Sequence, residues 1–243
     1  DGQQAILESH ALLVGAGGLG APVSLYLAAS GVGELTICDP DEVDLTNLQR
    51  QIVHDTGSIG RRKVESAAQT LARINPETKV NAVAERLAGE RLEKLVQSAS
   101  VVIDATDNFT TRHAINRACV KFGRPLVSGA AIRFDGQISV FDLRNPDCAC
   151  YHCLFPETED LEEMRCAVMG VFAPLVGIIG SAQAAEALKI LAGTGESLNG
   201  RLLMLDALSM QWRSVRLKKD PACPVCAGGQ TAQRETISSC QAN

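Results

Sequence analysis

Short apolar runs alternate with segments of helical periodicity through the first half of the chain. The pattern predicts buried strands at residues 11–14 and 101–104 and further strands at 34–38, 79–84 and 126–128, and helical patterns lie at 61–74 and 112–122. This alternation is typical of βαβ units, which form a parallel sheet with helices on both faces. We therefore expect an α/β, Rossmann-like fold with a largely parallel sheet.

The pattern changes after the last of these strands. Residues 137–143 alternate like a late strand that runs antiparallel to the others, and 201–205 and 212–217 are also strand-like. An apolar helical segment lies at 174–191, and a long connection at 145–169 carries charges and cysteines. A connection of this length inside a compact domain is usually functional. We expect the late strands to continue the sheet in antiparallel fashion.

The composition indicates a folded globular protein and argues against one class of ligand, nucleic acid. The chain has 243 residues, of which 46% are apolar and 21% charged, and its formal net charge is −5. These values are typical of a folded globular protein. We expect one domain over residues 1–227 and a polar tail at 228–243. The acidic balance argues against nucleic-acid binding, which needs a basic surface.

The sequence gives no indication of a membrane protein. Gln183, Glu186 and Lys189 interrupt the longest apolar stretch, 173–193, which argues against a membrane span. The chain opens at Asp1 without a methionine, so we expect native residues to precede it. No basic-then-apolar leader is visible, which favours a cytoplasmic location.

A glycine-rich loop follows the first predicted strand and opens a helix. Gly15, Gly17, Gly18 and Gly20 lie in the motif GAGGLG, whose glycines allow a tight turn, close approach to phosphate and close helix packing. The helix N-terminus also offers free N–H groups to an anion. Asp39 ends the second strand, where a carboxylate can bind ribose hydroxyls. This pattern predicts a nucleotide site, although an NAD-dependent dehydrogenase would have the same fingerprint.

Four further polar residues favour ATP over NAD. Asn47 and Arg50 follow the second strand, Lys63 begins the next helix, and Asp107 follows the strand at 101–104. A lysine at a helix N-terminus has the wrong sign for the helix dipole, so a nearby anion explains it better. Two cations beside a glycine loop, with an aspartate opposite, suit a triphosphate and its magnesium ion. The alternative is that Arg50 and Lys63 are solvated surface charges and Asp107 is a helix cap.

The nine cysteines are clustered late in the chain, and four of them form two CxxC pairs. The pairs are Cys150 with Cys153 and Cys223 with Cys226. Two such pairs complete a tetrahedral zinc site, and with all four positions filled by sulfur the site would be structural. Reduced structural cysteines or a redox pair are the alternatives. Cys148 leaves open which of the first three thiols bind, and His152 is expected to be a bystander.

The remaining cysteines differ in their surroundings. Cys38 and Cys119 lie in apolar patterns and are expected to be inert core residues. Cys166 lies in the long connection next to Arg165, where an exposed thiol could be an activated nucleophile. The glutamates nearby oppose this by raising the thiol pKa. A covalent role for Cys166 is therefore the less favoured alternative.

Taken together, these motifs resemble the MoeB/ThiF family, relatives of ubiquitin-activating enzymes that adenylate small sulfur-carrier proteins. The resemblance covers residues 1–226, and the molybdopterin-synthase branch is the most similar. The motifs that carry it, in family order, are Gly15-Ala-Gly17-Gly18-Leu-Gly20, Asp39-Pro-Asp41, Asn47-Leu-Gln-Arg50-Gln, Gly60-Arg-Arg-Lys63-Val-Glu, Ala105-Thr-Asp107-Asn108 and the two CxxC pairs.

The resemblance implies roles for matching residues. The glycine loop and Asp39 would hold ATP, and Asn108 would lie beside it. Asn47, Arg50 and Lys63 would contact the phosphates, and Asp107 would handle the magnesium ion. The nucleotide-binding half would span about residues 1–130, and the part that binds the carrier and zinc about residues 131–227.

The resemblance also implies the chemistry and the partners. The substrate would be a ubiquitin-fold carrier whose tail ends in Gly-Gly, and its terminal carboxylate would attack the α-phosphate to give an acyl-adenylate and pyrophosphate.

The family typically works as a homodimer. Family members carry an arginine in a segment that would lie before Asp1. No sulfurtransferase domain is recognised, so a separate sulfur donor is expected. Cys166 matches a cysteine that some relatives link covalently to the carrier.

Other functions remain open at the level of sequence. An NAD-dependent oxidoreductase would explain the glycine loop but not Arg50, Lys63, Asp107 or the CxxC pairs. A non-catalytic carrier-binding scaffold would keep the fold and zinc without turnover. ATP-dependent modification of a small molecule or RNA is a further possibility, against which the acidic balance argues weakly.

Overall fold

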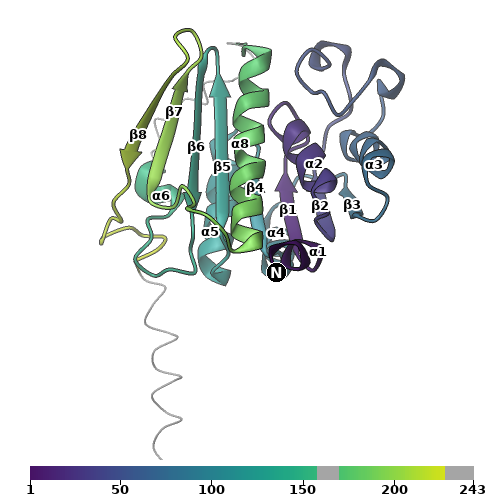
Figure 1. The fold of residues 1–243 in the computed structure, drawn as a ribbon. Coiled ribbons are helices and arrows are strands. Elements are labelled where there is room, and N and C mark those ends of the chain that lie inside the picture. Colours follow the sequence, from purple (N-terminus) through teal and green to yellow (C-terminus); the bar gives the residue numbers. More distant parts are fainter. Residues whose placement is uncertain (158–169, 228–243) are drawn as a thin grey trace, which may run out of the picture.

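The computed structural model describes residues 1–157 and 170–227, which build a mixed sheet flanked by helices (Figure 1). The sheet has eight strands in the order β3-β2-β1-β4-β5-β6-β7-β8. Their bounds are β1 (His10–Val14), β2 (Glu34–Cys38), β3 (Lys79–Val83), β4 (Val101–Asp104), β5 (Leu126–Ile132), β6 (Asp135–Phe141), β7 (Arg201–Asp206) and β8 (Gln211–Arg216).

The sheet has a parallel half and an antiparallel half. Strands β3, β2, β1, β4 and β5 are paired in parallel, whereas β5, β6, β7 and β8 are paired antiparallel. The predicted α/β class, with a largely parallel sheet continued by antiparallel strands, is therefore confirmed. Parallel pairs need crossover connections, and the chain supplies helices for them.

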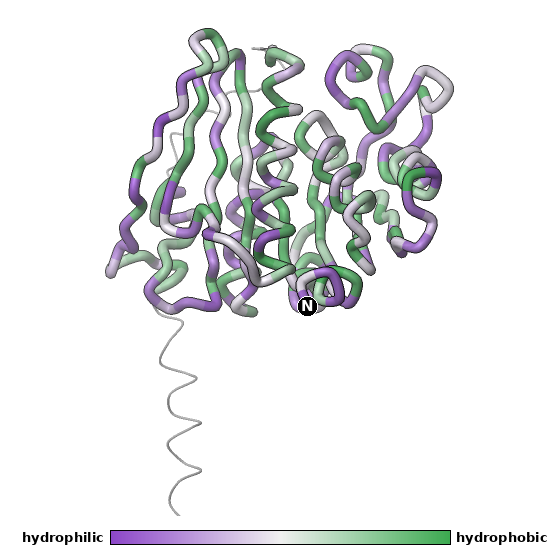
Figure 2. The backbone as a smooth tube through the Cα atoms, in the orientation of Figure 1, coloured by the Kyte–Doolittle hydropathy of each residue, from purple (hydrophilic) through white to green (hydrophobic). Residues whose placement is uncertain are grey.

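Helices cover both faces of the sheet. Figure 1 shows α1, α2 and α8 on the near face and α4, α5 and α6 behind it. The helices are α1 (Gly2–Leu7), α2 (Gly20–Ala29), α3 (Lys63–Ile74), α4 (Gly89–Ser98), α5 (Phe109–Phe122), α6 (Tyr151–Leu154) and α8 (Ala173–Ala192), with short 3₁₀ turns η1 (Leu45–Asn47) and η2 (Thr56–Ser58). Each face has its own apolar core, and Figure 2 shows hydrophobic residues concentrated along the central strands and α8.

The structure departs from the predicted elements in several places: β6 begins and ends two residues earlier than expected, and the short helices α1 and α6 were not predicted. Strand β5 continues to Ile132 instead of ending at Ser128, because Gly129, Ala130 and Ala131 pair with β6 across a tight hairpin. Such small residues carry no hydrophobic alternation. Helix α4 was not predicted, since of its ten residues only Leu92 and Val96 are buried.

Helix α8 is long and apolar enough to cross a membrane by length and composition, yet it packs as a core helix. It contacts α2 and lies against β4, β5 and β6. Its polar residues are used inside the protein: Gln183 Nε2 donates to Asp104 O at 2.8 Å, and Glu186 Oε2 accepts from Leu198 N at 2.8 Å. The residues that argued against a membrane span therefore have structural partners.

Two glycines of α8 provide a matched test of this packing. A Cβ on Gly180 would lie 2.4 Å from Leu19 O and 2.5 Å from Pro22 Cγ, whereas a Cβ on Gly177 meets nothing within 4 Å. We expect Gly180→Ala to lower the free energy of unfolding by about 1–3 kcal/mol, because α2 must move away. Gly177→Ala should leave it unchanged or raise it by up to about 1 kcal/mol. Urea unfolding of the two variants checks this, and equal stabilities would contradict it.

Candidate functional site

The glycine loop lies at the carboxyl end of β1, where the order of the strands reverses. Strands β2 and β3 lie on one side of β1, and β4 and β5 lie on the other. In open α/β sheets, ligands bind in the crevice at such a switch point. The loop leads directly into α2, whose first turn faces this crevice.

The glycines of the loop have distinct steric roles. Gly15 has a φ of +103°, and a Cβ there would lie 2.6 Å from Ala105 O. A Cβ on Gly20 would lie 1.9 Å from Gly15 O, so the loop closes tightly on the helix. A Cβ on Gly17 would meet only Gln51 Nε2, at 3.6 Å. The backbone at Gly17 is thus open on the side from which a phosphate would approach.

Asp39 is buried beneath this loop. Its Oδ2 accepts from Ala16 N at 2.8 Å, and its Oδ1 accepts from Asp41 N at 2.9 Å. The carboxylate therefore holds the loop in shape. Each carboxylate oxygen has a second lone pair, so both can also accept from a ligand hydroxyl.

His54 is a loop-supporting residue that sequence reasoning missed. Its Nε2 lies 3.1 Å from Ala16 O and its Nδ1 lies 2.9 Å from Ser66 Oγ. A carbonyl only accepts, so Nε2 carries the proton and the Ser66 hydroxyl donates to Nδ1. Burial lowers the pKa of His54, which keeps the ring neutral. Only its place shortly after Asn47-Leu-Gln-Arg50-Gln could have indicated this role.

The two predicted cations have different surroundings. Lys63 is buried at the start of α3, and its Nζ donates to Asp41 Oδ2 at 2.9 Å. Asp41 thus supplies an anion beside Lys63 from the protein itself, whereas the phosphate contact expected from the sequence stays a prediction. Arg50 is half-buried next to Gly18, and its guanidinium makes no hydrogen bond or ion pair with the described residues. Asn47 is tied in place by Gln51 Nε2, which donates to its Oδ1 at 2.9 Å.

Asp107 is exposed after β4 and is not the cap of α5. Asn108 is the cap, because its Oδ1 accepts from Thr111 N at 2.9 Å. The alternative in which Asp107 caps the helix is therefore wrong. Within residues 1–157 and 170–227, the Asp107 carboxylate has no hydrogen-bond or ion-pair partner.

A buried network positions the turn that carries Asp107. Arg112 donates through Nη2 to Thr106 O and to Gly129 O, the latter at 2.9 Å, and its Nη1 lies 3.8 Å from Asp104 Oδ2. Asp104 Oδ1 also accepts from Thr106 N at 3.0 Å, and its Oδ2 accepts from Ser128 Oγ at 3.0 Å. Sequence reasoning missed this network, because Asp104 closes an apolar run and Arg112 lies inside a helix.

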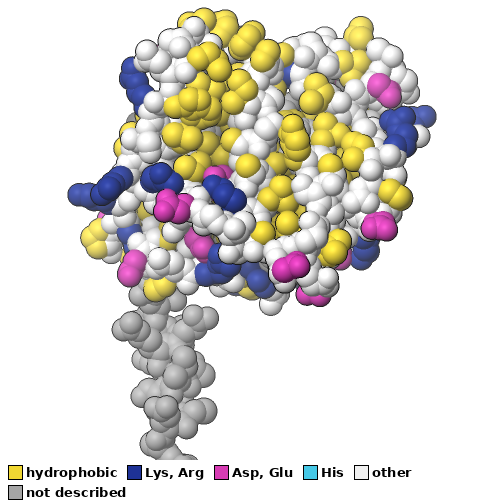
Figure 3. Space-filling model, viewed as in Figure 1, with side chains coloured by type: hydrophobic (Ala, Val, Ile, Leu, Met, Phe, Trp, Pro, Cys, Tyr) yellow, Lys and Arg dark blue, Asp and Glu magenta, His cyan; other side chains and the backbone are white. Residues whose placement is uncertain are grey.

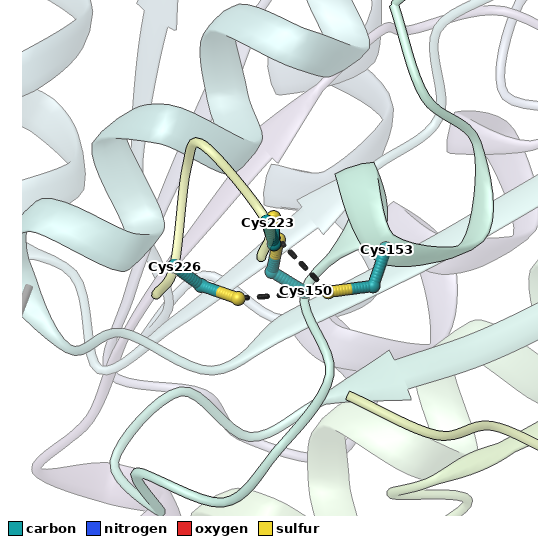
Figure 4. A group of neighbouring side chains, drawn as sticks. All are labelled: Cys150, Cys153, Cys223 and Cys226. Carbon is teal, nitrogen blue, oxygen red and sulfur yellow. Dashed lines mark hydrogen bonds between the residues drawn. The ribbon is translucent and has the colours of Figure 1, made fainter. Parts of the chain in front are cut away.

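The four predicted zinc ligands converge, as Figure 4 shows. Cys150 and Cys153 come from the start and interior of α6, and Cys223 and Cys226 from the segment after β8. All four Sγ atoms lie within 4.8 Å of one another, with contacts of 3.9, 3.7 and 3.5 Å between pairs. Zinc at about 2.3 Å from four tetrahedral sulfurs requires separations of about 3.8 Å. A disulfide would require about 2.05 Å. The cluster fits zinc.

The surroundings of the cluster support this assignment. Asn116 Nδ2 donates to Cys150 Sγ at 3.6 Å, and Asn116 Oδ1 accepts from Tyr151 N at 2.9 Å. Cys148 points elsewhere and bonds Asn199 Oδ1, which settles the ambiguity among the first three thiols. Burial raises the pKa of the Cys150 thiol to about 11. Coordination to a cation deprotonates such a thiol.

The other cysteines follow their predictions where the structure describes them. Cys38 and Cys119 are buried in apolar surroundings, and burial raises the pKa of the Cys38 thiol to about 12. Both are inert packing residues. Cys166 lies outside the described residues.

Comparisons with known proteins agree on one family. The model of the ThiF family matches residues 1–225. The chain is 45% identical to the sulfur carrier protein ThiS adenylyltransferase of Escherichia coli, over 94% of this chain and 90% of that protein. It is also 45% identical to the molybdopterin-synthase adenylyltransferase of the same organism, over 93% and 90%. The two are equally similar, so the expected preference for the molybdopterin branch is not seen.

A further relative is similar in sequence, and a solved structure shares the fold. The SAMP-activating enzyme E1 of Haloferax volcanii is 44% identical over 98% of this chain and 87% of that protein. The solved structure of E. coli MccB with ATP matches with a TM-score of 0.81 and 22% identity, covering 93% of this chain and 69% of that chain.

The zinc assignment predicts the result of metal removal. We expect the purified protein to hold one zinc ion in the four-cysteine cluster, and Cys226→Ser to lose it and to melt at a lower temperature. Cys148→Ser is the matched control, because a hydroxyl can replace this thiol at Asn199. Elemental analysis and thermal melting measure both effects. Full zinc retention in Cys226→Ser would contradict the assignment.

The buried, neutral His54 predicts a pH dependence of stability. Its pKa is lower in the folded state than the ordinary value of about 6.5. The unfolded state therefore binds more protons just below about pH 6.5, and the free energy of unfolding falls as the pH falls through that range. His54→Gln should show a shallower slope, measured by urea unfolding at several pH values. His10→Gln is the control, and equal slopes in the wild type and His54→Gln would refute the assignment.

Proposed function

The chain belongs to the ThiF family, and on that premise we propose that it adenylates the C-terminal carboxylate of a small sulfur-carrier protein. The observation that carries this is 45% identity, over more than nine-tenths of the chain, to two adenylyltransferases of such carriers. The activity belongs to thiamine or molybdopterin biosynthesis. An NAD-dependent oxidoreductase has no support from these relatives.

We assign the nucleotide to the crevice above β1 and β4. The open backbone at Gly17 and the N-terminus of α2 suit the phosphates, since free N–H groups and the helix dipole favour an anion. The buried Asp39 suits the ribose hydroxyls. Gly18 lies next to Arg50, and Gly15 lies next to the segment that leads to Asp107. The loop therefore has an arginine on one side and an aspartate on the other.

Two charges at this edge have no partner among the described residues. Arg50 offers a guanidinium, which binds phosphate oxygens in bidentate fashion. Asp107 offers a carboxylate, the kind of ligand that Mg²⁺ takes when it also binds phosphates. Lys63, held by Asp41, adds a buried positive charge, and Asn47 and Asn108 add polar groups. A magnesium ion bound here would neutralise charge on the phosphates.

The reaction needs little acid–base catalysis. A C-terminal carboxylate has a pKa of about 3.5 and is ionised at neutral pH. It attacks the α-phosphorus, the bond to the bridging oxygen breaks, and pyrophosphate leaves with the electron pair. The products are the acyl-adenylate and pyrophosphate. Arg50 and Lys63 would stabilise the charge that develops on the phosphates, so positioning and electrostatics supply the catalysis.

A surface for the carrier lies on the antiparallel half of the sheet. Gln137, Met204 and Arg213 are successive cross-strand partners and share one face. They line a pocket of about 350 Å³ together with Asp135 and Asp206. Two turns meet at the end of this half, where Ala207 N donates to the carbonyl of Phe134 at 2.8 Å. We propose that residues of the 131–227 part bind the carrier here, with its Gly-Gly tail reaching the nucleotide.

The opposite face suits a second copy of the chain. Figure 3 shows hydrophobic side chains gathered over the face formed by α2 and α8. Tyr26 on α2 and Phe172, the N-cap of α8, are both exposed large apolar residues. Contiguous apolar surface of this kind marks protein interfaces. We propose a homodimer through this face and a separate protein as sulfur donor.

Pyrophosphate exchange into ATP tests the proposed function. With Mg²⁺ and a ubiquitin-fold carrier that ends in Gly-Gly, labelled pyrophosphate should enter ATP, because the adenylation step is reversible. A carrier lacking its last glycine should give no exchange. Carrier binding without exchange would instead identify a non-catalytic scaffold.

Variants of the same assay test the site. Asp107→Ala should lower the exchange rate by about 10²–10³-fold, the cost of removing one preorganised electrostatic group. The matched control is Asp147→Ala, another exposed carboxylate outside the crevice. Cys166→Ala should keep its exchange activity, because adenylation forms no bond to sulfur. Unchanged exchange in Asp107→Ala would remove this residue from the site.

A further inference from the structure

A second cluster of potential metal ligands lies near the four cysteines. It consists of His113 on α5, His152 on α6 and Glu157 just beyond α6. One ligand atom from each lies within 4.8 Å of the other two. None of these three residues belongs to the cysteine cluster or to the nucleotide crevice.

His113 is buried without hydrogen bonds. His113 is only 1% exposed. In the described part of the chain, neither its Nδ1 nor its Nε2 has a hydrogen-bond partner. His152 Nδ1 is also buried and without one. The other two histidines differ, because both ring nitrogens of His10 and of His54 have polar partners. Buried polar groups are satisfied in the great majority of proteins, so an unpaired imidazole needs an explanation.

Packing alone does not supply the missing partners. The His113 ring meets Tyr151 edge-on at 5.3 Å and His152 at 5.7 Å between centroids. These ring contacts leave the nitrogen lone pairs unused. A neutral imidazole nitrogen is the most common metal ligand in proteins, and a metal ion would use the lone pairs of both histidines.

Helix α5 contributes side chains to both the cysteine cluster and the His113–His152–Glu157 cluster, because of the spacing of its residues. His113, Asn116 and Arg117 are three or four residues apart and share one face of α5. Asn116 donates to Cys150, whereas His113 faces His152. His152 lies between two cysteines in sequence, but its ring turns toward His113.

We propose that His113, His152 and Glu157 bind a second divalent metal ion, of the class that prefers imidazole and carboxylate ligands, such as Zn²⁺ or Co²⁺. Two nitrogens and one carboxylate oxygen are a ligand set that zinc uses, with a further position left to water. Binding requires the ligand atoms to approach to about 3.4 Å from one another, given metal–ligand bonds of about 2.1 Å. The exposed Glu157 side chain can bring its carboxylate closer to the two imidazoles, and a small rotation of the half-buried His152 can close the distance to His113.

Arg117 is the competitor for this ion. Its Nη1 donates to both carboxylate oxygens of Glu157, at 2.9 and 2.8 Å. Both side chains are about half exposed, and ion pairs in such positions are weak. An ion held by two imidazoles and the carboxylate can therefore replace this contact.

Cobalt titration of the untagged protein, with its cysteine cluster already filled by zinc, tests the proposal. We expect one equivalent of Co²⁺ to bind by equilibrium dialysis, with visible ligand-field bands and without the near-ultraviolet thiolate-to-cobalt band that sulfur ligands produce. Zinc should remain bound throughout. No saturable cobalt binding, or cobalt that displaces zinc and shows the thiolate band, would overturn the proposal.

Variants locate the ion. His152→Gln and Glu157→Gln should each weaken cobalt binding by more than the roughly 10- to 100-fold that an outer-shell partner costs. His10→Gln is the matched control and should bind as the wild type does. Arg117→Gln should bind more tightly, because the carboxylate loses its competitor. Unchanged affinity in both His152→Gln and Glu157→Gln would refute the site.

His113→Phe separates a ligand from a packed ring. If His113 is a ligand, cobalt should raise the melting temperature of the wild type but not that of His113→Phe. If the ring only fills space, cobalt should have the same effect on both, which would refute the proposal. His152→Gln and Glu157→Gln keep the test valid should His113→Phe fold poorly.

Discussion

The crevice that we assign to the nucleotide depends on one residue, Ala16, which two buried side chains hold in place. Asp39 accepts from its N–H and His54 donates to its C=O, so both polar groups of the residue are satisfied inside the protein. The neighbouring glycines have no side chains, and a Cβ at Gly15 or Gly20 would clash with nearby backbone atoms. A rigid loop of this kind presents its remaining N–H groups to a ligand without a further cost of ordering.

The antiparallel half of the sheet needs a different kind of support. Strand β8 is exposed along its whole length and, within residues 1–157 and 170–227, pairs with β7 alone. The segment that follows it carries Cys223, which contacts Cys150, and Cys226, which contacts Cys153. The two residues of each pair are 73 positions apart in the sequence. An edge with little apolar burial gains stability from a metal that joins distant segments, since metal-binding free energy becomes folding free energy.

The sequence was most informative where chemistry and local periodicity coincide. Strands β2 and β4 lie at the predicted residues, because apolar residues predominate in buried parallel strands. The four cysteine ligands also follow from their spacing. Partners that are distant in the sequence could not be predicted. Tertiary packing pairs Lys63 with Asp41, Arg112 with Asp104 and His54 with Ala16, and such pairs produce no periodic pattern in the sequence. Helix α4 was missed for a related reason, since a mostly exposed helix shows only two buried positions.

Helix α5 connects sites that are far apart in chemistry. Its N-terminus, capped by Asn108, adjoins Asp107 at the nucleotide edge, and Asn116, about 12 Å further along the axis, holds a cysteine of the metal cluster. Under the proposed function, the nucleotide and the metal would contact the same helix, which would link their binding. Such linkage is reciprocal: whatever factor the metal contributes to the affinity for nucleotide, the nucleotide returns to the affinity for metal. Under the proposed function, the metal centre would contribute to the energetics of catalysis without touching a reacting atom.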